Sequence, residues 1–128
     1  MLPPQFRLSR SADVALTRQR GRRWQHSFIV LFVYTQSHEV LPDSRFAFSV
    51  GRHIGKATRR NRVKRRLREI VRRHLDMLEP GFDCLFVARA GAVTASHSEL
   101  EGAVMQLLIN AGVMSSKRAM PRSGGTVS

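Results

Sequence analysis

The sequence predicts an α/β protein of the α+β sandwich type, in which helices pack on a small mixed four-stranded sheet. The chain has 128 residues, enough for one sizeable core but too few for two. Its apolar content of 42% and charged content of 24% are ordinary for a globular protein. Helix-type and strand-type patterns follow one another in the order α-β-β-α-β-α. We expect one domain over residues 1–114 and a disordered tail over residues 115–128, where Pro, Gly and Ser are frequent.

The first predicted elements are a short helix and a buried strand. Residues 9–20 are typical of a helix, with Ser11 as its N-cap, Asp13 near its positive end and Gly21 at its stop. Residues 26–34 form a run of β-branched and aromatic side chains, which predicts a buried strand.

A second strand is predicted over residues 45–50. Its sequence RFAFSV alternates, so both phenylalanines and the valine share one face. Pro42-Asp43 is the strongest turn signal before it. We expect this strand to pair with residues 26–34 as a hairpin.

A long helix is predicted from near Lys56 to just before Pro80. Apolar residues recur there at helical spacing and form one stripe, comprising Val63, Leu67, Ile70, Val71, Leu75 and Leu78. The stripe must face the sheet, so the arginines of this helix are expected to line its exposed side as a stiff basic ridge. The preceding loop, between Gly51 and Gly55, predicts a tight turn that brings Lys56 to a helix N-terminus, where anions bind readily.

The last predicted elements are a strand and a helix. Residues 82–88 are apolar and contain Cys84, for which a small buried side chain is the default interpretation. Ser96 and Glu99 have the spacing of a capping box, and the apolar helix that follows is expected to end at Gly112.

Positive charge is concentrated in two segments. The chain holds 22 basic and 9 acidic residues, a formal net charge of +13. Residues 1–23 contain six basic residues and one acidic residue. Residues 52–73 contain eleven basic residues and one acidic residue. The rest of the chain is slightly acidic, with five basic and seven acidic residues. Such clustering favours a polyanionic partner, either nucleic acid or an anionic membrane surface, over a general solubility charge.

The segment RRNRVKRRLRE, residues 59–69, indicates which polyanion. On a helix Arg62 faces Arg66 and Lys64 faces Arg68, and these like charges repel one another unless phosphates neutralise them. Arginine donates to phosphate oxygens in a bidentate fashion, while Asn61 can bond a base edge or a ribose hydroxyl. The alternative interpretation of this segment is a basic helix face that is simply exposed to solvent.

Several classes of site are disfavoured. One cysteine excludes an internal disulfide, so no disulfide partner is expected, and it fits a reducing compartment. The five histidines lack paired metal-ligand spacing, and the acids form no carboxylate cluster, so no dedicated metal site is expected. No catalytic triad stands out. The longest apolar run is too short to span a bilayer and no export signal is seen, so a cytoplasmic location is expected.

Residues 48–73, FSVGRHIGKATRRNRVKRRLREIVRR, closely resemble the signature of the bacterial ribonuclease P protein component. Residues 81–92 resemble that family's next strand and its Ala-Arg ending, and residues 6–23 its opening segment and first helix. The resemblance implies an α/β fold with a left-handed β-α-β crossover, where general topology rules predict a right-handed one.

The resemblance also implies a function. The protein is expected to be a subunit of the endonuclease that removes 5′ leaders from precursor tRNA. The RNA subunit and its magnesium ions are expected to hydrolyse the phosphodiester bond, while the polypeptide binds both RNAs and is not itself catalytic.

Positions matching the family motif supply candidate site residues. Those expected to bind the catalytic RNA are Arg60, Asn61, Arg62, Lys64, Arg65 and Arg68. Those expected to bind the leader, in a cleft between the first helix and the sheet, are Arg7, Val14, Arg18, Arg45, Ser49, Arg52, Lys56 and Arg89. Val14 and Arg18 stand where the family's first helix usually has aromatics, so the Arg18 guanidinium is expected to stack instead.

Other functions compete with this one. The nearest alternative is a ribosomal or general RNA-binding protein that uses the same basic ridge without a processing role. A metal-dependent nuclease is disfavoured because carboxylates do not cluster. Membrane binding is disfavoured because the strands need the apolar stripe of the long helix for their core.

Overall fold

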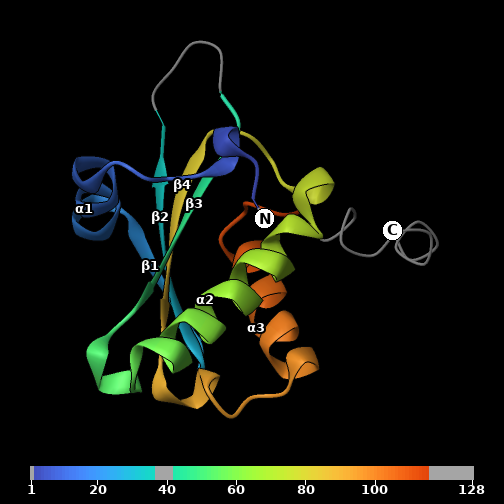
Figure 1. Ribbon diagram of the computed structural model, residues 1–128. Coiled ribbons are helices and arrows are strands. Elements are labelled where there is room, and N and C mark those ends of the chain that lie inside the picture. Colours follow the sequence, from blue (N-terminus) through green and yellow to red (C-terminus); the bar gives the residue numbers. More distant parts are fainter. Residues whose placement is uncertain (1, 37–41, 116–128) are drawn as a thin grey trace, which may run out of the picture.

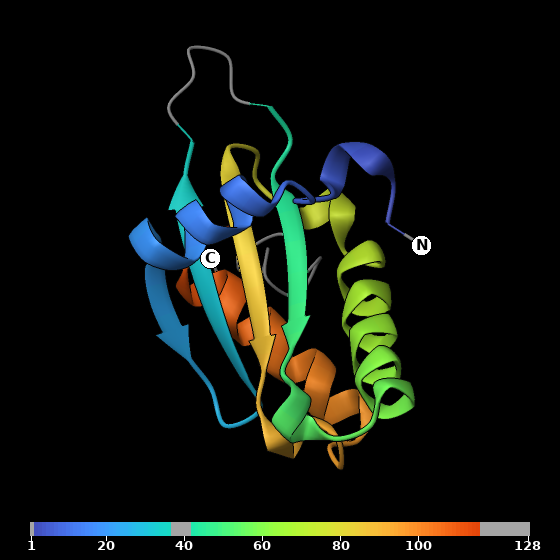
Figure 2. The same cartoon turned by 60° about the vertical axis from the view of Figure 1, so that its left-hand side comes forward.

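A mixed sheet of four strands carries α1 on one face and α2 and α3 on the other (Figures 1 and 2). The computed structural model describes residues 2–36 and 42–115, so the predicted tail lies, apart from Ser115, outside the described residues. The main elements are α1 Ser11–Arg20, β1 Arg22–Gln25, β2 Ile29–Thr35, β3 Arg45–Val50, α2 Ala57–Arg72, β4 Phe82–Ala88 and α3 His97–Asn110. Short 3₁₀ turns are η1 Pro4–Phe6, η2 Arg52–Ile54, η3 Leu75–Met77 and η4 Ala90–Ala92.

The fourth strand is β1, which the sequence patterns did not locate. It is an edge strand with mostly exposed side chains, so it shows no apolar alternation. It pairs antiparallel with β2, and residues 26–28, predicted as strand, form the turn between them. Gly21 lets α1 lead directly into β1, because a Cβ there would clash with the Thr17 carbonyl oxygen and lie 2.9 Å from that of Val33.

The predicted hairpin between residues 26–34 and 45–50 is wrong. The strand order is β1-β2-β4-β3, so β4 lies between the two supposed partners. β4 runs antiparallel to β2 and parallel to β3. Its Cys84, Leu85 and Phe86 are at most 1% exposed. A strand that is apolar on both faces is buried best at the centre of a sheet, which leaves the more polar β3 at the edge.

The crossover from β3 through α2 to β4 is left-handed. In Figure 2 both strands run downward, β4 lies to the left of β3, α3 passes behind the sheet and α2 stands to its right. The buried stripe of α2 packs against α3 and the sheet on the face opposite α1. This confirms the handedness that the family resemblance implies and departs from the usual right-handed rule.

The core lies between the sheet and the pair α2 and α3. The predicted α2 stripe is buried at Val63, Leu67, Ile70 and Val71. The helix nevertheless ends at Arg72 rather than just before Pro80. Leu75 belongs to η3, and Leu78 bridges Met114, but both still pack against the core.

Helix capping is partly as predicted. Ser96 and Glu99 form the expected capping box, with bonds of 3.0 and 2.8 Å. The N-cap of α1 is Arg10 rather than Ser11, and it makes no side-chain cap bond. Lys56 is the N-cap of α2, as the turn between the two glycines predicts.

Cys84 is a buried side chain within β4. Burial raises the pKa of its thiol well above the ordinary value, so it stays protonated and packs as a small apolar group. Across residues 2–36 and 42–115, none of the helices combines the length and apolar character needed to cross a membrane.

One ion pair joins the end of α2 to α3 and makes stability depend on pH. His74 Nε2 donates to a Glu101 carboxylate oxygen at 2.8 Å, and this bond lowers the pKa of Glu101. The Glu101 contribution is therefore present above the pKa of glutamate in the unfolded chain and is lost as pH falls through the folded-state pKa. Glu101→Gln should lower the unfolding free energy by about 0.5–1 kcal/mol near pH 6. The deficit should shrink towards pH 3 in urea titrations, and a constant deficit would contradict this assignment.

Candidate nucleic-acid interface

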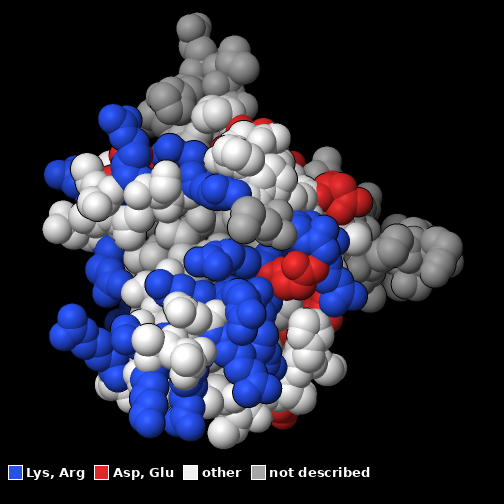
Figure 3. Space-filling model, in the orientation of Figure 1, with Lys and Arg blue, Asp and Glu red and all other residues white. Residues whose placement is uncertain are grey.

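Basic side chains gather over α2 and the neighbouring end of the sheet (Figure 3). The apolar stripe of α2 faces the core, so its polar residues are forced outward. Arg59, Asn61, Arg62, Arg65 and Arg68 are exposed, while Arg60 and Lys64 are half-buried. The predicted basic ridge is therefore confirmed as a surface feature of a packed helix.

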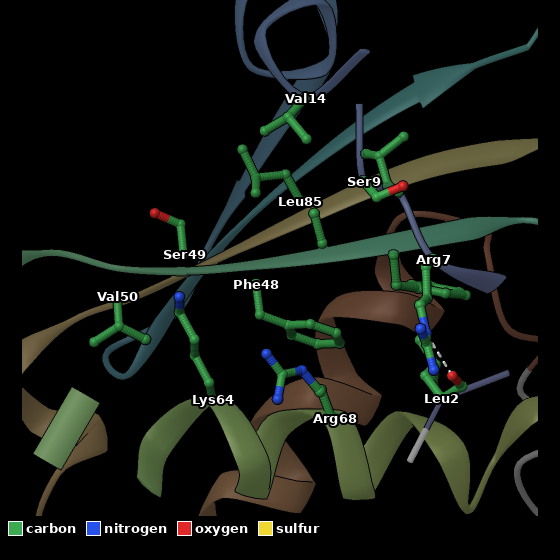
Figure 4. Close-up of a pocket in the computed structure, with 13 residues that line it drawn as sticks. Leu2, Arg7, Ser9, Val14, Phe48, Ser49, Val50, Lys64, Arg68 and Leu85 are labelled. Carbon is green, nitrogen blue, oxygen red and sulfur yellow. Dashed lines mark hydrogen bonds between the residues drawn. The ribbon is translucent and has the colours of Figure 1, made fainter. Parts of the chain in front are cut away.

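The basic residues of α2 separate onto two flanks. Lys64 and Arg68 point toward β3 and line a groove there (Figure 4). On the other flank, a smaller hollow near η4 is lined by Thr58, Arg59, Arg62, Val63, Arg66 and Val93. Arg66 is tied down in this hollow, because its guanidinium donates to the Ala95 carbonyl oxygen at 2.8 Å. One helix thus presents two separate basic surfaces.

The larger hollow, here called the β3 groove, wraps around the edge strand and has a volume of about 630 Å³. Arg7, Lys64 and Arg68 supply positive charge around apolar side chains of α1 and the sheet (Figure 4). The residues that line it are Leu2, Arg7, Leu8, Ser9, Val14, Phe46, Ala47, Phe48, Ser49, Val50, Lys64, Arg68 and Leu85.

The N-terminal segment forms one wall of the β3 groove. Arg7 forms a parallel bridge with Phe46, and the Leu8 amide donates to the Phe46 carbonyl oxygen at 2.9 Å. Arg7 Nε also donates to the Leu2 carbonyl oxygen at 2.7 Å. These bonds hold the Arg7 side chain beside the β3 edge.

A compact turn supplies a second group of exposed basic residues. Gly55 has φ +141°, a conformation that side chains with a Cβ rarely adopt, and it joins η2 to α2. Arg52, His53 and Lys56 are exposed there. No side chain caps the first turn of α2, so its amide groups remain available to an anion.

The predicted leader-binding residues do not all converge. Arg7, Val14 and Ser49 line the β3 groove, together with Lys64 and Arg68, which were predicted to bind the catalytic RNA. The remaining five predicted leader residues lie outside its lining: Arg18, Arg45, Arg52, Lys56 and Arg89. The groove also contains Phe48, which shares one face of β3 with the buried Phe46 and Val50. Phe48 is only half-buried because β3 is an edge strand, and it stacks on Phe86 at 5.6 Å between ring centroids.

The Arg45 side chain is held by carboxylates of the protein itself. Its guanidinium donates to both Asp83 carboxylate oxygens at 2.9 and 2.8 Å and lies 3.6 Å from Asp13 of α1. The bonds to Asp83 raise the pKa of Arg45. Asp83 is 5% exposed and also accepts a bond from Gln36 at 2.8 Å. Arg45 therefore compensates a buried charge and links α1 to the sheet.

Removing the buried carboxylate should destabilise the fold. Asp83→Ala leaves the Gln36 amide without its acceptor and Arg45 with only the Asp13 contact at 3.6 Å, so we expect the unfolding free energy to fall by about 2–4 kcal/mol. The matched control is Asp13→Ala, which removes the more exposed partner of the same arginine and should cost at most about 1 kcal/mol. Urea unfolding measures both, and equal losses would contradict a structural role centred on Asp83.

No metal ligands can be assigned to the part of the chain that the structure describes. Within residues 2–36 and 42–115, no group of three or more His, Cys, Asp or Glu side chains could hold an ion. The described surface instead offers guanidinium, ammonium, amide and aromatic groups, which bind phosphates and bases.

Comparisons with known proteins converge on one family. The Ribonuclease P family matches residues 2–112. A ribonuclease P protein component from Herpetosiphon aurantiacus is 37% identical over 103 residues, covering 80% of each chain. Another, from Acidothermus cellulolyticus, is 37% identical over 108 residues, covering 84% of this chain and 89% of the relative. The solved RNase P protein of Thermotoga maritima has a TM-score of 0.70 at 28% identity, with 84% of this chain and 97% of that chain covered.

Proposed function

Because this chain belongs to the family of ribonuclease P protein components, we propose that it binds a catalytic RNA and the 5′ leader of precursor tRNA, and so assists removal of the leader. The observation that carries the proposal is the division of the basic helix α2 into two flanks, one of which opens into the β3 groove. A protein that holds two RNA segments at once needs two such surfaces.

The outer side of α2, together with the hollow near η4 that Arg62 also lines, is the proposed dock for the catalytic RNA. Asn61, Arg62 and Arg65 are exposed and follow one another on a rigid helix, so their spacing is fixed before the RNA arrives. Binding then costs little backbone ordering, and only the exposed side chains lose conformational freedom. Arginine forks suit phosphate oxygens, and the Asn61 amide can bond a ribose hydroxyl or a base edge.

The β3 groove is the proposed site for the single-stranded leader. Single strands are typically bound by basic side chains that follow the backbone, combined with apolar or aromatic surfaces under the bases. Lys64 and Arg68 supply the charge from α2, and Arg7 supplies it from the opposite wall. Val14 and Phe48 supply apolar contact area (Figure 4).

The proposed role of the polypeptide in cleavage is to position RNA and neutralise phosphates. We assign phosphodiester hydrolysis to the catalytic RNA and its magnesium ions. The chain's own contribution is to hold the leader beside that RNA, so that the two RNAs meet in a fixed orientation. Arg52, Lys56 and Arg89 are further candidates for this electrostatic role.

Recovery of bound RNA from cell extract tests the proposal against a ribosomal or general RNA-binding role. The tagged protein should enrich the catalytic RNA and precursor tRNA over ribosomal RNA. A variant with Asn61, Arg62 and Arg65 replaced by alanine should lose the catalytic RNA. Enrichment of ribosomal RNA alone would overturn the proposed function.

A further inference from the structure

We propose that Arg45 and Asp13 are positioning residues for leader selection: their ion pair fixes α1 over the sheet and thereby sets the α1 wall of the β3 groove. Neither residue needs to contact RNA. The inference rests on the proposed function of the groove. It gives Arg45 an indirect role in place of the leader contact that the family motif implies, and it gives Asp13 a role beyond the start of a helix.

Apolar packing holds α1 only weakly. Of its ten residues Thr17 alone is buried, whereas α2 buries four residues and α3 buries five. The Thr17 hydroxyl group donates to the Asp13 carbonyl oxygen within the same helix, so this bond does not tie α1 to the sheet. Most helices in proteins are held by packing of an apolar face. The position of α1 therefore depends more than usual on polar contacts with the sheet.

Two such contacts lie at opposite ends of α1. Near its C-terminal end, the Arg18 guanidinium lies 5.8 Å from the ring centroid of Phe32 on β2. In its first turn, Asp13 meets Arg45 of β3. The Asp13 contact is the one beside the β3 groove, because the groove wraps around β3.

The Arg45 guanidinium has a fixed direction. Its Nε and one terminal nitrogen donate to the Asp83 carboxylate at 2.9 and 2.8 Å, and its other terminal nitrogen lies 3.6 Å from an Asp13 carboxylate oxygen. Each of the three nitrogens thus faces a carboxylate oxygen. A guanidinium is planar and rigid, so its bonds to the buried Asp83 also determine where it holds Asp13.

The ion pair joins the two walls of the β3 groove. Asp13 is followed directly by Val14, which lines the groove from α1, while Arg45 is the first residue of β3. Movement of the first turn of α1 would displace Val14 relative to Ser49, which lines the groove from β3 (Figure 4). A displacement of about 1 Å is enough to weaken a site that depends on orientation.

The local charge argues against a direct contact between Arg45 and a phosphate. One positive charge on Arg45 stands beside two negative charges on Asp13 and Asp83, which leaves this cluster with a net charge of −1. The Asp13 side chain is 31% exposed, so a phosphate that approached Arg45 would also approach a carboxylate. Arg45 is therefore better placed to hold α1 than to hold the leader.

The first test replaces Asp13 with Asn and compares it with Asp76→Asn. Both variants remove one negative charge, and Asp76 is an exposed residue of η3, outside this cluster. The affinities of the holoenzyme for leader-bearing and leaderless tRNA are measured at saturating protein. Electrostatics alone predicts that either variant binds RNA at least as tightly as the wild type. We expect instead that Asp13→Asn lowers the ratio of the two affinities about three- to fivefold, as for one lost ion pair, while Asp76→Asn leaves the ratio unchanged.

The second test leaves α1 itself unaltered, because loss of Asp13 also removes an acidic residue from the first turn of that helix. Arg45→Lys keeps a positive charge for Asp83, but an ammonium group lacks the fork that reaches both carboxylates. The ratio of affinities should fall as it does in Asp13→Asn. The double variant should be no worse than either single variant, because both substitutions break the same link.

Three results would overturn the inference. One is an unchanged or raised leader preference in Asp13→Asn, which would mean that Asp13 does not position the groove. Another is a leader preference that Arg45→Lys retains, as a direct contact through charge would predict. The third is that the losses add in the double variant. Absence of any leader preference in the wild type would instead contradict the proposed function, so the two failures are distinguishable.

Discussion

Replacing Asn61, Arg62 and Arg65 together with alanine is expected to lower affinity for the catalytic RNA about 100-fold. All three side chains are exposed on α2, so their removal leaves the core intact. Each lost contact to phosphate or ribose is worth about 1 kcal/mol, and three sum to about two powers of ten. The slope of log affinity against log salt should fall by about 1.4–1.8, because two positive charges are lost. Titration of the labelled RNA at several salt concentrations measures both quantities.

A double variant, Arg20→Ala with Arg22→Ala, is the control for net charge. It also removes two exposed positive charges, but from the end of α1 and from β1, on the opposite edge of the sheet from β3. Its affinity for the catalytic RNA should stay within a few-fold of the wild type. An equal loss in both variants would show that total charge, rather than the α2 ridge, governs assembly.

Replacing Lys64 and Arg68 with alanine is expected to abolish most of the preference for leader-bearing substrate. These residues are the α2 side of the β3 groove. Their loss removes two charges from a partly enclosed site, where charge-assisted bonds are stronger than on open surface. We expect the ratio of affinities for leader-bearing and leaderless tRNA to fall about tenfold or more, measured with holoenzyme assembled at saturating protein.

The opposite flank of the same helix supplies the control. Arg59→Ala with Arg62→Ala also removes two positive charges from α2, but from the hollow near η4. This pair should weaken assembly and leave the leader preference unchanged once the complex has formed. If both pairs changed the leader preference equally, the two flanks would not have separate roles.

The sequence predicts the elements that bury an apolar stripe. The residues of α2 from Val63 to Val71, the strand Phe82–Ala88 and the Ser96 capping box are all found as expected, because periodicity and capping are local properties. β1 was missed because an exposed edge strand has little apolar pattern. The strand order was mispredicted because it depends on which strand is buried on both faces, a comparison that no single segment reveals.

The candidate site was predictable in composition but not in arrangement. Charge clustering and the family resemblance identify the basic residues of α2. They do not show that Lys64 and Arg68 turn into the β3 groove, because that depends on how α2 sits against an edge strand. Nor do they show that Arg45 of β3 pairs with Asp83 of β4, because these two residues are 38 positions apart in the chain. The family motif therefore places Arg45 among the expected leader-binding residues, whereas the structure shows its guanidinium bonded to Asp83 of the protein itself.

The central claim is that this chain assists a catalytic RNA in removing the 5′ leader from precursor tRNA. The most direct test is cleavage of precursor tRNA by the RNA subunit from the same source, at low magnesium, with and without the protein. The account predicts that the protein raises the cleavage rate of the RNA under these conditions and cleaves nothing when the RNA is omitted. A cleavage rate that does not change on adding the protein would contradict it.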